Sequence, residues 1–216
     1  RCVMSLYLFL KTFILSFYTT ILNPTNLHNN LKFQQIYQIW SSIKQDNIIG
    51  DYTEFGVFKG KSLYHSWRCA KKHKIKNVMF YGFDSFEGFP VENHDLYTNE
   101  KFKTTIEKVN KNFKNKNNVQ LIKGFFDQSL KQDQIQSIKN ISFAFIDCDI
   151  YESSISIFNY LESRVSVGGF IMIDDFSSVD KNGNSIYKAW EENKKINQDF
   201  IFYSNYSNGQ VFRRIK

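Results

Sequence analysis

The sequence predicts an α/β fold: a mostly parallel seven-stranded sheet with an antiparallel last strand, helices on both faces and an N-terminal helical extension. Two observations favour this fold. Between residues 50 and 174, short apolar runs alternate with stretches of helical periodicity, which is typical of parallel strands joined by crossover helices. Near the C-terminus, two strand patterns are joined by a connection too short for a parallel crossover, which indicates an antiparallel pair.

The N-terminal segment is unusually apolar. Residues 1–46 are expected to form the helical extension, as a lid or an oligomer contact, and residues 47–216 the α/β domain. Segment 3–22 is nearly long enough to cross a bilayer, but Lys11 lies inside it and its Ser and Thr residues share one stripe at helical spacing. We therefore expect a buried amphipathic helix that packs on the domain or on a partner subunit, with a membrane anchor as the alternative.

The remaining elements follow in order along the chain. A turn-rich break at 24–30 leads to a helix over 31–45, whose apolar face is Phe33, Ile36, Trp40 and Ile43. The expected strands are 50–55, 78–84, 119–123, 141–147, 168–174, 199–205 and 209–215. The expected helices between them are 61–73, 98–113, 128–137, 150–163 and 185–196.

Composition limits the partners and the compartment. The chain carries a net charge of +7, but only five of its 28 basic residues are Arg, and the excess Lys is scattered. This pattern indicates a solvated Lys-rich surface and no nucleic-acid partner, and RNA binding is the alternative. The three cysteines are widely spaced, which argues against a disulfide framework or a zinc site and favours a cytoplasmic location.

The first candidate site is "DYTEFGVFKGKSL", residues 51–63. Glu54 ends a strand, Gly56 and Gly60 occupy the turn, and a helix begins near Lys61. Glycines in such a turn let a ligand approach the backbone, and the helix N-terminus favours a negative group such as a carboxylate. A plain strand-to-helix turn is the alternative interpretation.

Two further carboxylates follow the next strands. Asp84, in "FYGFDSFEGFP", ends the second strand, where an acidic side chain can accept hydrogen bonds from both hydroxyls of a ribose. Asp127, in "LIKGFFDQSL", follows the third strand. It is equally suited to accept from an exocyclic amine such as that of adenine or to cap the following helix.

Three aspartates follow two neighbouring strands of the predicted sheet. "FAFIDCDIYES" ends its strand at Asp147, and "FIMIDDF" ends its strand at Asp174 and Asp175. Because the carboxyl ends of parallel strands face one crevice, these side chains are expected to converge there and to need a cation, since close carboxylates repel one another. Oxygen ligands suit Mg²⁺, Mn²⁺ or Ca²⁺. The alternative is that one or two of them cap the following turns.

Two nearby residues have other expected roles. Asp149 precedes a helix and Glu152 lies three residues on, which is a capping-box arrangement, so we expect Asp149 to be structural. His94 lies in the long loop after Asp84, where it is a candidate base.

Several segments together resemble one family. "EFGVFKGKSL", "FDSFEGFP", "VQLIKGFFDQSL", "IDCDIYESS" and "VSVGGFIMIDDF" occur in the order seen in the TylF/MycF-like O-methyltransferases, the macrocin O-methyltransferase family. The resemblance covers residues 50–176 well and extends more loosely to both ends. It implies the Rossmann-like fold of class I S-adenosylmethionine-dependent methyltransferases.

The resemblance also implies a site and an activity. It places S-adenosylmethionine on Glu54, Gly56, Gly60, Ser62, Asp84 and Asp127. It places Mg²⁺ on Asp147, Asp174 and Asp175, which are then also the candidate catalytic residues. The implied reaction is Mg²⁺-dependent methyl transfer to a hydroxyl of a sugar or glycosylated small molecule. A homo-oligomer through the N-terminal helix is expected from the apolar segment 3–22, and not from the resemblance. The alternatives are a phenolic or other small-molecule acceptor, or a non-catalytic nucleoside-binding module.

Overall fold

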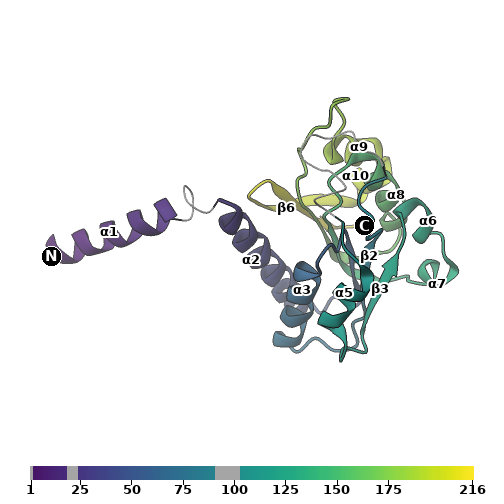
Figure 1. Ribbon diagram of the computed structural model, residues 1–216, viewed down its shortest axis with the longest axis horizontal. Helices are drawn as coiled ribbons and strands as arrows, with labels where there is room; N and C mark the ends of the chain where they lie inside the picture. Colours follow the sequence, from purple (N-terminus) through teal and green to yellow (C-terminus); the bar gives the residue numbers. More distant parts are fainter. Residues whose placement is uncertain (1, 19–23, 91–102) are drawn as a thin grey trace.

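Seven strands form one sheet in the order β3-β2-β1-β4-β5-β7-β6 (Figure 1). The strands are β1 (Asp51–Phe55), β2 (Phe80–Asp84), β3 (Val119–Lys123), β4 (Ile141–Ile146), β5 (Val165–Ile173), β6 (Phe200–Tyr206) and β7 (Gly209–Arg214). All neighbouring strands pair in parallel except β7, which is antiparallel to both β5 and β6. The computed structural model describes residues 2–18, 24–90 and 103–216, and it confirms the predicted sheet.

Helices lie on both faces of this sheet, and α1 (Cys2–Phe17) precedes them. The other described helices are α2 (Pro24–Gln45), α3 (Lys61–Lys72), α5 (Ile106–Asn110), α6 (Phe126–Ser129), α7 (Asp133–Gln136), α8 (Tyr151–Leu161), α9 (Ile186–Glu192) and α10 (Lys194–Asp199). A 3₁₀ turn, Lys111–Phe113, follows α5. The start of the helix predicted at 98–113 and the candidate base His94 lie outside the described residues.

Four predicted helices differ from the observed ones. The segment 98–113 has no helix at 103–105, because α5 begins at Ile106 after its N-cap Thr105. The turn expected at 24–30 is helical, because α2 begins at Pro24, and proline suits a first helical position, where no N–H is needed. The segment 128–137 forms two short helices, α6 and α7. The segment 185–196 divides at Asn193, whose side chain accepts from the backbone N–H of Ile196 and so starts α10.

One apolar cluster lies between the sheet and the helices α2 and α3. Trp40 on α2 is fully buried, with ring centroids of Tyr52, Phe80 and Phe143 at 5.8–6.0 Å, and its indole N–H donates to Ser66 of α3 at 2.8 Å. The predicted α2 face is therefore confirmed at Ile36, Trp40 and Ile43. This contact holds the C-terminal half of α2 firmly against the sheet.

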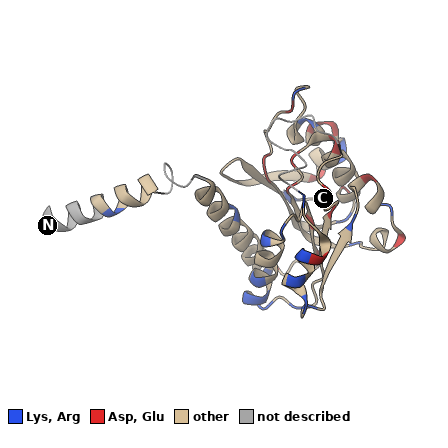
Figure 2. Cartoon of the chain, viewed as in Figure 1, with Lys and Arg blue, Asp and Glu red and all other residues tan. Residues whose placement is uncertain are grey.

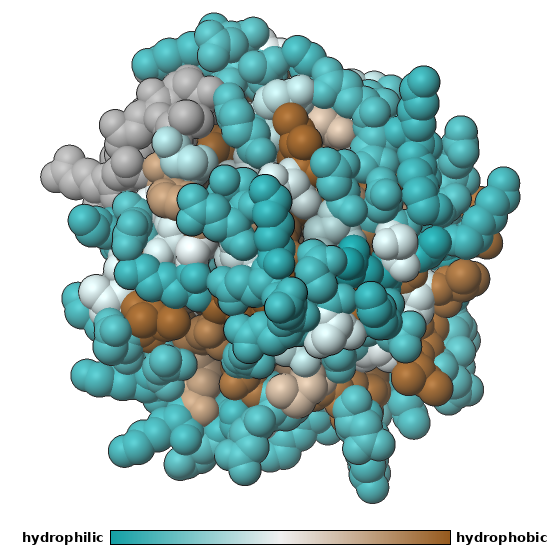
Figure 3. Space-filling model, turned by 90° about the vertical axis from the view of Figure 1, so that its right-hand side faces the viewer, coloured by the Kyte–Doolittle hydropathy of each residue, from teal (hydrophilic) through white to brown (hydrophobic). Residues whose placement is uncertain are grey.

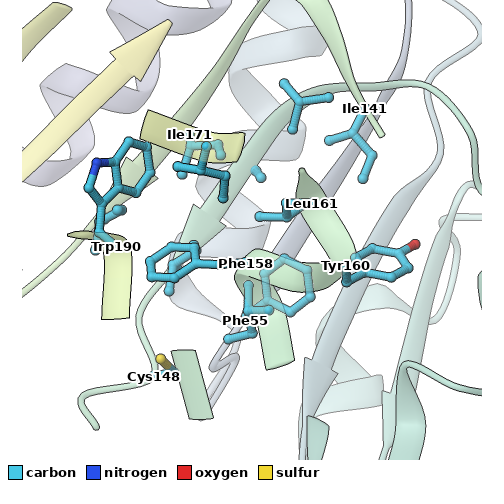
Figure 4. Packing of buried hydrophobic residues seen from close by; sticks show 14 of the residues in the cluster. Phe55, Ile141, Cys148, Phe158, Tyr160, Leu161, Ile171 and Trp190 are labelled. Carbon is cyan, nitrogen blue, oxygen red and sulfur yellow. The ribbon is translucent and has the colours of Figure 1, made fainter. Parts of the chain in front are cut away.

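A second cluster fills the opposite face, under α8, α9 and α10. Figure 4 shows Phe158 of α8 and Trp190 of α9 packed beside strand residues such as Ile171. Hydrophilic side chains cover most of the face in Figure 3, where apolar side chains form separate patches. Lys and Arg residues are spread over several elements, including α1, α2 and α3 (Figure 2).

The helix α1 projects away from the rest of the chain in Figure 1. Its apolar side chains Leu10, Phe13, Ile14, Leu15 and Phe17 are exposed. The expected packing of this segment on the domain is therefore wrong for these residues, while packing on a partner subunit stays a prediction, as does the domain boundary after residue 46. In the described part of the chain, no helix is long and apolar enough to cross a membrane.

Candidate active site

A cavity of about 710 Å³ lies along the carboxyl ends of the parallel strands. Its walls are the turns after β1, β2, β3, β4 and β5 together with the first half of α2. The strand order reverses between β1 and β4, so this is the crevice where α/β sheets bind ligands. The predicted site residues that line it are Gly56, Ser62, Asp84, Asp147, Asp174 and Asp175.

Gly56 is required by a close approach of two backbones. It has φ +93°, and a Cβ built on it would lie 1.9 Å from the carbonyl oxygen of Asp147. Any side chain here would push the turn after β1 away from the end of β4. Gly60, with φ +76°, instead faces Val109 and Phe113, so its role is in packing and not in lining the cavity.

Glu54 lies beneath the cavity and does not line it. Its carboxyl group is fully buried and accepts from the hydroxyls of Tyr52 at 2.5 Å and Ser62 at 2.7 Å. Burial raises the pKa of Glu54 to about 8, although these two hydrogen bonds oppose the rise. Glu54 therefore orients Ser62, which does line the cavity.

Asp84, at the end of β2, binds the backbone of the turn that follows β1 and contains Gly56, which we call the glycine turn. One carboxylate oxygen accepts from the backbone N–H groups of Val57 at 2.9 Å and Phe58 at 2.8 Å, and the other accepts from Phe86 at 2.6 Å. Burial raises the pKa of Asp84, and the three hydrogen bonds oppose that rise. The carboxylate thus fixes the shape of the turn, and its predicted contact with a ribose stays a prediction.

Asp147 and Asp174 converge, as the sequence predicted, but they converge on a lysine. The ammonium Nζ of Lys32, on α2, lies 3.1 Å from Oδ2 of Asp147 and 2.5 Å from Oδ2 of Asp174. The Lys32 side chain is 11% exposed and Asp174 is 2% exposed. Burial would lower the pKa of Lys32, but the two carboxylates outweigh it and raise that pKa, so Lys32 is a cation.

Asp174 has further donors. Tyr206 donates its hydroxyl to Oδ1 at 3.0 Å, and the Nε2–H of His28 donates to Oδ2 at 3.3 Å. Burial would raise the pKa of Asp174, but the bond from His28 and the charge of Lys32 outweigh it, so that pKa is lowered. At Asp147, burial dominates and raises the pKa, and Asp174 adds to the rise. Asp174 is thus the better stabilised anion of the pair.

Asp175 and Asp149 line the same cavity and interact electrostatically with this pair. Asp175 accepts from the side-chain amide of Asn208, in the β6–β7 turn. Asp149 is not the helix cap that the sequence predicted, because its φ of +64° is left-handed and the N-cap of α8 is Ile150, without a side-chain bond. Asp149 lines the cavity instead, and burial raises its pKa.

The residues as arranged do not fit the predicted metal ion. Within residues 2–18, 24–90 and 103–216, no group of three His, Cys, Asp or Glu side chains is placed to hold one. An all-oxygen donor set would suit Mg²⁺. However, an ammonium group lies between two of the three carboxylates, and Asn208 holds the third. A metal ion on all three aspartates would require Lys32 to leave.

Three residues around the acidic pair were missed by the sequence reasoning, and Asp127 lies elsewhere than predicted. Lys32 and His28 lie four residues apart on α2, one turn before Ile36, so they continue its buried stripe. The position of Lys32 in line with the apolar residues of this helix was the signal that could have indicated a buried lysine. Asp127 lies in the first turn of α6, does not cap it, and lines a smaller cavity of about 380 Å³. Ser207, which contacts His28 at 3.0 Å, had no signal in the sequence.

This sheet order, with a glycine turn after β1 and a cavity along the carboxyl edge, is the fold of the class I methyltransferases. Two solved structures share it. The O-methyltransferase NovP superposes with a TM-score of 0.70 and 23% identity over 86% of this chain and 80% of that one. The calicheamicin methyltransferase CalS11 superposes with a TM-score of 0.69 and 15% identity over 88% and 82%.

The model of the macrocin-O-methyltransferase (TylF) family matches residues 26–212, and the chain belongs to this family. It is 25% identical over 170 residues to demethyldecarbamoylnovobiocin O-methyltransferase of Streptomyces niveus, covering 71% of this chain and 64% of that protein. It is 27% identical over 150 residues to a rhamnosyl-tetracenomycin-C 4'-O-methyltransferase of Streptomyces olivaceus, covering 63% and 56%. The chain thus spans less than two thirds of the length of both relatives.

Proposed function

We propose that this protein is an S-adenosylmethionine-dependent O-methyltransferase that acts on a hydroxyl of a sugar or glycosylated small molecule. One observation carries the proposal. The glycine turn and the acidic pair open into the same cavity, and the backbone at Gly56 lies directly against the backbone of Asp147. A donor on the turn and an acceptor on the acidic pair would therefore be neighbours, as methyl transfer requires.

The donor side is the turn between β1 and α3. Its backbone is held by Asp84 and its Ser62 by Glu54, so the turn is rigid before a ligand arrives. The N-terminus of the twelve-residue helix α3 favours a carboxylate such as that of the methionine moiety. The family of the chain supports S-adenosylmethionine as the donor.

The acceptor side is the group of Asp147, Asp174 and Lys32. In the reaction, a lone pair of the acceptor oxygen forms the new O–CH₃ bond while the C–S bond breaks and its electron pair goes to sulfur. The hydroxyl proton then needs an acceptor. Asp147 suits this role, because its carboxylate is in the cavity and burial raises its pKa. No step is assigned to Mg²⁺, because the arrangement does not fit it.

A sugar hydroxyl is favoured by the relatives. The name of the Streptomyces olivaceus relative describes a 4'-O-methyltransferase of a rhamnosyl compound. Mycinamicin III 3''-O-methyltransferase of Micromonospora griseorubida is 21% identical over 71% of this chain and 66% of that protein. Polar groups from α2, including Asn29 and Asn30, line the same cavity as the acidic pair. They could donate to and accept from neighbouring hydroxyls of a sugar ring.

The test is transfer of a labelled methyl group from S-adenosylmethionine. The purified protein is incubated with a panel of glycosides, sugar nucleotides and simple phenols, and the products are identified by mass spectrometry. We expect a methyl ether on a sugar and none on a phenol. A labelled phenol product would replace the proposed acceptor class, and failure to bind S-adenosylhomocysteine in calorimetry would refute the methyltransferase assignment.

A further inference from the structure

The acidic pair of the cavity, Asp147 and Asp174, already holds a positive charge that belongs to the chain. Lys32 reaches both carboxylates, at 3.1 Å and 2.5 Å, from a helix more than a hundred residues earlier in the sequence. We propose that the Lys32 ammonium is the resident cation of this site and hydrogen-bonds the acceptor oxygen in place of a divalent metal. The role of Lys32 toward an acceptor rests on the proposed function, whereas its occupation of the cation position does not.

The first support is the saturation of Asp174. Its Oδ1 accepts from Tyr206, and its Oδ2 accepts from both Lys32 and His28. The carboxylate is 2% exposed, so all these donors belong to the protein. An incoming metal ion would have to displace donors that already neutralise this oxygen pair.

The second support is the burial of Lys32 itself. Its side chain is 11% exposed, and its ammonium lies 5.8 Å from the ring centroid of Phe145. If a metal took both carboxylates, a largely buried ammonium at the wall of the cavity would lose both of its anions, which is unfavourable. The same place stabilises Lys32 as long as it keeps the two carboxylates.

The third support is the anchoring of α2. One turn after Lys32, Ile36 is fully buried, and one turn further Trp40 packs on the sheet. The backbone of α2 therefore cannot carry Lys32 away from the acidic pair without opening the core. Any exit of the ammonium would therefore depend on rotation of the Lys32 side chain alone, into the cavity that it lines.

The chemistry of an ammonium suits the acceptor role. It has three N–H donors, of which two point to the carboxylates, so one remains to hydrogen-bond an oxygen in the cavity. A hydroxyl oxygen held there would be oriented by Lys32. When its proton passes to Asp147 as the O–CH₃ bond forms and the C–S bond of the donor breaks, Lys32 stabilises the developing negative charge and keeps its own protons.

The experiment that decides the cation position uses Mn²⁺ alone as the probe. Metal-free wild-type protein, Lys32→Met and Lys32→Arg are titrated with Mn²⁺ and followed by electron paramagnetic resonance. Lys44→Met is the matched control, because Lys44 is an exposed lysine of the same helix. We expect weak Mn²⁺ binding by wild type, Lys32→Arg and the control. Lys32→Met should bind at least about tenfold more tightly, because a positive charge a few ångströms from a divalent ion repels it even in water.

Two outcomes would overturn the proposal. One is tight Mn²⁺ binding by the wild-type protein, and the other is a Lys32→Met affinity equal to that of wild type. If Lys32→Met does not fold, the wild-type and Lys32→Arg titrations still decide, since a resident cation predicts weak binding in both.

A second arm measures methyl transfer after chelator treatment. Wild type should keep its rate, and Lys32→Met should lose about 100-fold or more in kcat while still binding S-adenosylhomocysteine. Loss of wild-type transfer on chelation, restored by Mg²⁺, would refute the catalytic role. A protein that binds no S-adenosylhomocysteine would refute the proposed function and leave the Mn²⁺ result to decide the cation position.

Discussion

Replacement of Gly56 by alanine tests the contact on which the site geometry depends. The new Cβ would lie 1.9 Å from the carbonyl oxygen of Asp147, and Gly56 has φ +93°. The left-handed backbone alone costs about 1–3 kcal/mol for a residue with a side chain. The clash requires a backbone shift of about 1 Å, and overpacking of this kind adds about 1–3 kcal/mol. We therefore expect Gly56→Ala to lower the free energy of unfolding by about 2–6 kcal/mol.

Gly183→Ala is the matched control for this variant. Gly183 has φ +77°, but nothing lies within 4 Å of the position that a Cβ would take there, so only the backbone strain applies. Its loss should be about 1–3 kcal/mol. Both variants are compared with wild type by urea unfolding, with linear extrapolation to water.

The two variants should also differ in ligand binding. Gly56→Ala should weaken S-adenosylhomocysteine binding in calorimetry, because it separates the turn from Asp147, while Gly183→Ala should leave it unchanged. Equal losses of stability in the two variants, with unchanged ligand affinity in both, would show that the close approach at Gly56 does not shape the site.

Three other predictions concern groups around the cavity. Burial raises the pKa of Glu54 to about 8, so between about pH 4.5 and about pH 8 the folded chain keeps a proton that the unfolded chain releases. Glu54 therefore makes the free energy of unfolding fall as pH rises through this range. Glu54→Gln should remove this part of the pH dependence in urea unfolding, and an unchanged pH dependence would contradict the assignment. Asp84→Asn replaces one of the two carboxylate oxygens that accept three backbone N–H groups. We expect the free energy of unfolding in urea to fall by about 1–3 kcal/mol and S-adenosylhomocysteine to bind more weakly. An affinity equal to that of wild type would show that the turn does not need a negative charge. Trp40→Ala empties a fully buried position and should cost about 3–5 kcal/mol in the same assay, while a loss below about 1 kcal/mol would mean that α2 is not held as the structure indicates.

Most of the fold could be predicted because its signals are local. Each predicted strand overlaps an observed one, because apolar runs of strand length alternate with segments of helical periodicity. The helix boundaries were less accurate. The segment 24–30 read as a turn because Pro24 and several Asn residues favour turns, yet packing of the later residues of α2 on the sheet extends the helix through it.

The site, like the fold, was predicted from the sequence in part. The convergence of Asp147 and Asp174 followed from the sequence, because β4 and β5 are adjacent and parallel and each carboxylate comes directly after its strand. The predicted capping role of Asp149 was wrong, because Asp149 has a left-handed backbone and lines the cavity, while Ile150 is the N-cap of α8. A backbone angle of this kind has no signature in a single aspartate.

The sequence by itself determined the succession of strands along the chain, the turn with Gly56 and the edge of the sheet at which the carboxylates gather, because these depend on periodicity and on residues close together in the chain. Only the tertiary structure decided which cation stands between Asp147 and Asp174. Lys32 reaches them because Ile36 and Trp40 dock α2 across the sheet at one position. That docking is set by the packing of side chains distant in sequence, and no local pattern encodes its result.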